Sequence, residues 1–65
     1  MNWDQIEGKW HQMKGQVRTA FGELTDNDIA EMRGRREELV GKLQERYGYA
    51  KAEAQRRVDE FAAKL

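Results

Sequence analysis

The 65-residue chain has no cysteine and no proline, and it contains a single histidine, His11. Without cysteine, neither a disulfide framework nor a thiolate metal site can stabilise so short a chain. A metal site at His11 would need three or four ligands, and catalysis would need a partner that orients the imidazole. Because His11 lies off the apolar stripe, between Trp10 and Gln12, we expect an exposed, structural residue.

Net charge and long apolar runs are also lacking. Twelve basic side chains balance twelve acidic ones, so the chain does not have the basic footprint of a dedicated nucleic-acid binder. No segment approaches the ~20 apolar residues of a membrane span, and the start, Met1 to Asp4, has neither the basic nor the apolar region of a signal peptide. We expect one soluble, cytoplasmic domain over residues 1–65, near the lower size limit for independent folding.

Apolar residues at helical spacing predict four helices, over residues 3–21, 26–33, 35–47 and 50–64. Because proline and alternating β-type segments are absent, the predicted fold class is all-α. Asn2 with Gln5, and Thr25 with Asp28, have the spacing of capping boxes at the first two helix starts. Ala50 is a poor cap for the last helix.

A break at Gly34 separates the second and third predicted helices. One uninterrupted helix over residues 26–47 would be about 33 Å long, longer than the roughly 28 Å diameter expected for a compact domain of this size. The first helix fits whole by the same arithmetic, with Gly8 and Gly15 as points where it can kink.

The six glycines form two triplets with a seven-residue step, at positions 8, 15, 22 and 34, 41, 48. Segments 14–22 and 40–48 also match each other, with an aliphatic residue two positions after the first glycine and an aromatic residue six after it. This internal repeat predicts two related helical hairpins. Glycine inside a helix costs about 1 kcal/mol relative to alanine, so its regular use needs a reason.

Two interpretations of the glycines are open. Gly22 and Gly48 fit helix stops after Phe21 and Tyr47, and all six project away from the apolar stripes. In the first interpretation, the glycines are helix stops and flexible points that bend short helices around a small core. Alternatively, they form a smooth backbone strip for another chain or a second copy. The glycines left unexplained inside the predicted helices, and so candidates for an interaction surface, are Gly8, Gly15 and Gly41.

The densest basic cluster is Arg33, Arg35 and Arg36, extended by Lys42 and Arg46. A phosphate-contacting surface is conceivable there. However, Glu37 and Glu38 follow at once, and such interleaving is typical of a solvated helix face with paired charges. The three arginines join the three glycines as candidate interaction residues.

The acidic residues Asp26 and Asp28, with Glu23 and Glu31 nearby, are spaced for helix capping rather than for a calcium loop. Trp3 and Trp10 lie one heptad apart on one face and are expected in the core. Tyr49 follows the Gly48 stop and is expected to pack over the end of the helix at 35–47.

Several segments resemble the CsbD-like family of bacterial stress proteins: Gly8-Lys9-Trp10, Lys14-Gly15-Gln16-Val17, Phe21-Gly22-Glu23-Leu24-Thr25-Asp26, the run from Gly34 to Gln44, and Glu45-Arg46-Tyr47-Gly48-Tyr49. The resemblance spans nearly the whole chain. It implies a small, abundant cytoplasmic protein made under general stress, and a bundle of about four short helices arranged as two crossed helical hairpins. It supplies no catalytic residues, because the family's biochemical role is not established.

The sequence contains no nucleophile–base pair, phosphate loop or metal constellation, so we expect neither an enzyme nor a cofactor or small-molecule substrate. The leading hypothesis is a hydrophilin-like protectant, and the alternative is a module that docks a protein partner or itself. Residues 1–32 have three basic and six acidic side chains, a net charge of −3, and residues 33–65 have nine and six, a net charge of +3. This difference could support head-to-tail contact. Nucleic-acid binding is the least favoured hypothesis.

Overall fold

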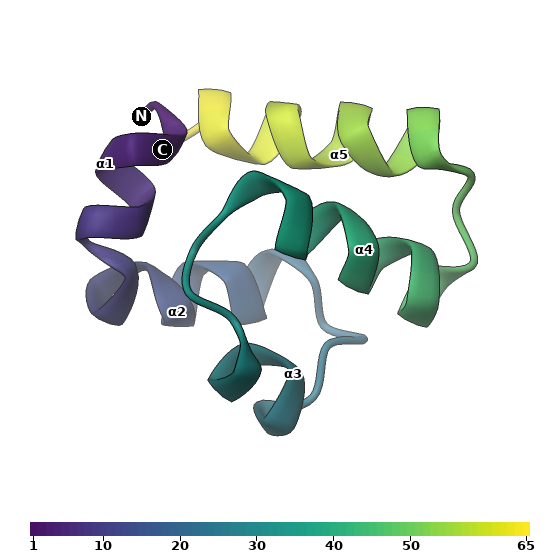
Figure 1. Ribbon diagram of the computed structural model, residues 1–65, viewed down its shortest axis with the longest axis horizontal. Helices are drawn as coiled ribbons and strands as arrows, with labels where there is room; N and C mark the ends of the chain where they lie inside the picture. The colour runs from purple at the N-terminus through teal and green to yellow at the C-terminus, as the bar shows by residue number, and fades with distance from the viewer.

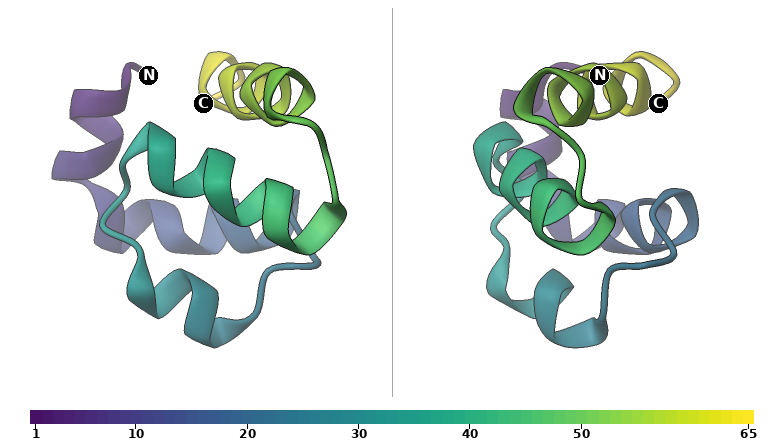
Figure 2. Two further views of the ribbon diagram at one scale, coloured as in Figure 1. Left: turned by 45° about the vertical axis from the view of Figure 1, so that its right-hand side comes forward. Right: turned by 90° about the vertical axis from the view of Figure 1, so that its right-hand side faces the viewer.

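The computed structural model covers residues 1–65 and contains only helices, joined by short connections. The helices are α1 (Trp3–Gly8), α2 (Trp10–Ala20), α3 (Asp26–Glu31), α4 (Arg36–Tyr47) and α5 (Lys51–Ala63). In Figures 1 and 2, α3 runs back in the direction opposite to α2, and α5 runs back along α4. The all-α prediction is confirmed. The chain forms a closely packed hairpin, α4–α5, and a looser one, α2–α3, preceded by α1, with five helices in place of the four expected.

The predicted helix over residues 3–21 is divided at Lys9, whose φ of −114° and ψ of 23° are not helical. The Lys9 N–H still donates to the Gln5 carbonyl at 3.0 Å, and its own carbonyl accepts two N–H bonds from α2. The bend therefore loses few hydrogen bonds. It lies beside Gly8 and not at Gly15, and it turns α1 steeply away from α2 (Figure 1).

Both predicted capping boxes are present. Asn2 Oδ1 accepts from the Gln5 N–H at 2.8 Å, and Gln5 Oε1 accepts from the Asn2 N–H at 3.1 Å. Thr25 and Asp28 exchange the same pair of bonds at 3.1 and 3.0 Å. These reciprocal bonds satisfy N–H groups that a helix start leaves without partners. The first and third helices therefore begin where the sequence predicts.

The predicted helix ends are only partly correct. Gly48 ends α4 in the left-handed region, with φ +72°. Gly22 does not act in this way: α2 ends one residue earlier than predicted, and Phe21, with φ −126°, is the residue that caps it. Gly22 has no positive φ. The chain leaves the helical conformation before it reaches this glycine, so a left-handed residue is not needed there.

The break at Gly34 is confirmed, and it is wider than one residue. Helix α3 ends at Glu31, two residues before the predicted end, and α4 starts at Arg36. Glu38 Oε1 accepts from the N–H groups of Arg33 and Arg35 at 2.8 and 3.0 Å. These bonds hold the connection against the first turn of α4.

The last helix, α5, begins after Ala50 without a side-chain cap and ends at Ala63.

The core draws on both hairpins. Tyr49 packs against it, as predicted, whereas Trp3 and Trp10, which were expected in the core, are half-buried beside it. Tyr49 stacks on Tyr47 with ring centroids 5.1 Å apart, and no large hydrophobic side chain is exposed. The molecule measures 27 × 23 × 17 Å, and no helix is both long and apolar enough to cross a membrane. The buried cluster comprises Val17, Phe21, Leu24, Ile29, Met32, Leu39, Val40, Leu43, Ala54, Val58 and Phe61.

Candidate interaction surface

The three candidate glycines all leave open space on the surface. A Cβ atom added at Gly8, Gly15 or Gly41 would meet no heavy atom within 4 Å. Gly15 and Gly41 lie inside α2 and α4, whereas Gly8 is the last residue of α1. The internal packing of the protein therefore does not explain why glycine stands at these positions.

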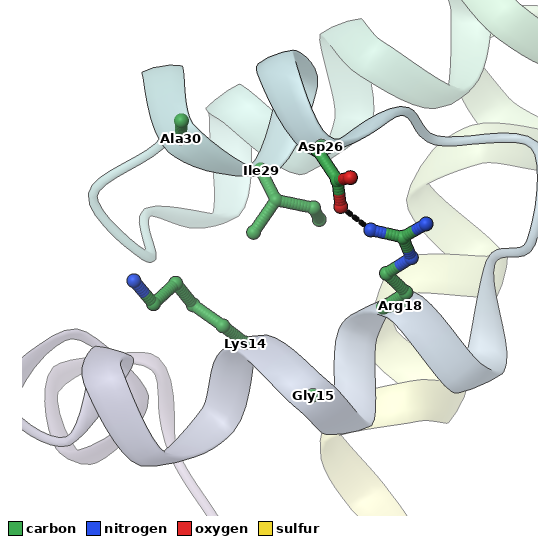
Figure 3. A pocket seen from close by; sticks show the side chains of 6 residues that line it. All are labelled: Lys14, Gly15, Arg18, Asp26, Ile29 and Ala30. Carbon is green, nitrogen blue, oxygen red and sulfur yellow. Dashed lines mark ion pairs between the residues drawn. The ribbon is translucent and has the colours of Figure 1, made fainter.

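Gly15 lines a hollow of about 290 Å³ between α2 and α3. Figure 3 shows Lys14 and Arg18 projecting from α2 and Ile29 and Asp26 facing them from α3. Arg18 forms an ion pair with Asp26 across the hollow. Lys14 makes no ion pair, and Ile29 is only 7% exposed. The result is an open hollow with an apolar floor and a basic rim.

Gly41 lines a hollow of about 370 Å³ toward α5, whose rim includes Arg36 and Lys51, and an acidic hollow of about 340 Å³ between α4 and the end of α3. In the acidic hollow Lys42 is the only cation beside four glutamates. Lys42 lies 3.7 Å from Glu31 and 4.0 Å from Glu45. The acidic hollow shares no residue with the hollow around Gly15, and Gly8 lines none of the three. The glutamates around Gly41 are Glu31, Glu37, Glu38 and Glu45.

The candidate arginines are separated by ion pairs to different helices. Arg35 Nε lies 3.2 Å from Glu7 on α1, and Arg36 donates to both carboxylate oxygens of Asp59 on α5 at 2.8 and 3.0 Å. The Arg36 hydrogen bonds lower the pKa of Asp59. Only the Arg33 side chain makes no ion pair. The sequence cluster is thus not a continuous basic patch in the fold.

Asp28 combines its capping role with a buried ion pair. Its carboxylate is fully buried and accepts from Arg46 Nε and Nη2 at 2.7 and 2.8 Å, while Lys42 Nζ lies 3.3 Å away. The Arg46 hydrogen bonds, with the Thr25 N–H, hold the pKa of Asp28 well below its usual range, although burial opposes them. The sequence indicates the cap but not the pairing, for which the i,i+4 spacing of the two cations on α4 is the only signal.

The opposite charges of the two halves meet inside the molecule. The pairs Glu7–Arg35 and Asp28–Arg46 each join an acid of the first half to a base of the second. Part of the charge difference that suggested contact between molecules therefore serves the fold itself.

The remaining candidate chemistry is sparse. His11 is exposed on α2, as expected. No group of three or more His, Cys, Asp or Glu side chains is arranged to hold a metal ion.

Residues 4–56 match the family described as CsbD-like. The chain is 50% identical over 64 residues to UPF0337 protein pc0632 of Protochlamydia amoebophila, covering 98% of this chain and 97% of that protein. It is 48% identical to UPF0337 protein PA4738 of Pseudomonas aeruginosa over the full length of both. It is also 50% identical to UPF0337 protein YjbJ of Escherichia coli K12 over 58 residues, which is 89% of this chain and 84% of that protein.

Proposed function

The chain belongs to the CsbD-like family, and we propose that it is a non-enzymatic stress protein that protects other proteins when the cell loses water. The observation that carries the proposal is the surface. Charged residues make up 37% of the chain with no net charge, and no large hydrophobic side chain is exposed. Such a surface has no apolar patch on which partly unfolded proteins can stick.

The distribution of the charges supports the same proposal. Opposite charges lie next to each other on the helices, as in the network of Glu53, Arg56, Arg57 and Glu60 on α5. Arg56 and Arg57 lower the pKa of Glu53, so this carboxylate stays charged to a lower pH than an isolated glutamate. A protein of this kind can be present in bulk among other proteins and keep hydrated charge at their surfaces.

The proposal is tested by drying or freezing a labile enzyme with increasing molar ratios of the protein and measuring its residual activity. We expect protection that grows with the molar ratio and extends to unrelated enzymes. It should also survive a charge change such as Lys51→Glu, because Lys51 is exposed and makes no ion pair. Protection no better than that of an equal mass of serum albumin would contradict the proposal.

A second candidate function is a specific interaction module. The observation that favours it is that Gly15 and Gly41 leave open space on helix faces without serving the internal packing. A module should be saturated by one partner in a pull-down from stressed cells and should lose that partner in a Gly15 variant. Nucleic-acid binding has less support because ion pairs separate Arg35 from Arg36. Absence of salt-dependent affinity at about 50 mM salt would end it.

A further inference from the structure

We propose that the hollow around Gly15 and the hollow around Gly41 are the two halves of a head-to-tail contact between copies of this chain. This inference is independent of protective activity, because it concerns only how one copy meets the next. The occupant of each hollow is the complementary helix face of a second copy.

The first basis is the conformational disadvantage of these glycines. Each lies inside a helix, where glycine is less favourable than alanine by about 1 kcal/mol. Gly34 is required by the fold, but an added Cβ at Gly15 or Gly41 meets nothing within 4 Å. A helix face without a Cβ lets the backbone of another helix approach closely, so its use lies between molecules.

The second basis is charge complementarity. Around Gly15 the two cations Lys14 and Arg18 face one acid, Asp26, which leaves a net charge of +1. In the acidic hollow between α3 and α4 four glutamates face Lys42, which leaves −3, while the α5 side of Gly41 has the two cations Arg36 and Lys51. Lys14 in the first hollow and Glu37 in the second make no ion pair within their own chain. A contact between the two hollows would supply each with a partner.

The internal repeat gives the two glycines equivalent places on their helices. Gly15 and Gly41 hold the same position in the matching segments 14–22 and 40–48, so each opens the exposed face of its helix in a similar way. The two hollows share no residue, and one copy can therefore use both at once. Contact between two different patches is heterologous, and it builds a chain or a ring of copies.

The contact is expected to be weak. The hollows are lined by only 6 and 7 residues, whereas a stable complex uses about 20–30 residues on each side, so association should become visible only on the order of 0.1–1 mM protein. It should also weaken as salt is added, because exposed charges are screened.

The test uses Gly15→Gln and Gly41→Gln, each of which fills one hollow with a neutral side chain. Sedimentation should show the mean mass of the wild type rising above 7.7 kDa with concentration, while each variant alone remains monomeric. An equimolar mixture of the two variants keeps one intact copy of each half, so it should form a dimer and nothing larger. Gly8→Gln is the matched control, since Gly8 is equally open but lines neither hollow.

Thermal unfolding of every variant checks that a loss of association does not come from a loss of folding. The variants should be at least as stable as the wild type. A wild type that stays at 7.7 kDa up to 1 mM would overturn the proposal. So would a Gly15→Gln variant that associates like the wild type, or a mixture that stays monomeric.

Discussion

The main chain of Gly34 lies against the indole ring of Trp10. A Cβ atom at this position would stand 3.0 Å from Trp10 Cε3 and 3.1 Å from the Cα of Glu7, and Gly34 has a φ of +88°. The connection between α3 and α4 thus packs on the bend between α1 and α2. The projection of the sequence on a helix suggested that Gly34 faces away from the packed interior. It does not, because no helix passes through it.

Gly34→Ala should lower the free energy of unfolding by about 3 kcal/mol, since it combines an unfavourable positive φ with overpacking against Trp10 and the Glu7 backbone. Gly48→Ala is the control: its φ is +72°, but an added Cβ meets nothing, so a loss of about 1 kcal/mol is expected. Urea unfolding followed by tryptophan fluorescence measures both. Equal losses would show that contact with Trp10 contributes nothing.

Asp28→Asn should destabilise the protein by about 2 kcal/mol, because it removes the buried carboxylate and leaves Arg46 without its charged partner. Circular dichroism during urea unfolding measures the loss. Asp59→Asn is the comparison, because Asp59 also makes a two-bond pair with an arginine but is exposed. Exposed pairs contribute little, so its loss should be clearly smaller. A reversed order would contradict the importance of burial.

Acid should destabilise the protein partly through Asp28. The folded state lowers the pKa of this carboxyl, so the unfolded chain takes up its proton first, and the stabilisation present at neutral pH declines below about pH 5. Asp28→Asn has no such proton to bind. Its free energy of unfolding should therefore fall less steeply between pH 5 and 3, as measured by urea unfolding at each pH. Parallel curves would show that other carboxyl groups account for the decline.

Gly15→Ala should stabilise the monomer by about 0.5–1 kcal/mol, because alanine is the better helix former and its Cβ enters open space. Thermal unfolding at low protein concentration measures this gain without self-association. A loss of stability would mean that Gly15 has a role inside the fold that its surroundings do not reveal.

Local signals were the most reliable guide to this fold. The capping boxes at Asn2 and Thr25 and the left-handed Gly48 depend on neighbours within a few residues, and all three were predicted. The prediction that Gly22 ends a helix was wrong, because Phe21 ends α2 without a left-handed residue. The bend at Lys9 could not be placed either, since the apolar stripe continues across it and the helix fits the size of the domain.

The sequence by itself determined the helical class, most helix boundaries and the break near Gly34, because periodicity, caps and chain length act locally or through overall size. Only the tertiary structure decided which distant groups meet. It placed Gly34 on Trp10, buried Asp28 between Arg46 and Lys42, and separated Arg35 from Arg36. The ion pairs and packing contacts of these residues join elements that are far apart in the chain. They depend on the angles between helices, which no local pattern specifies.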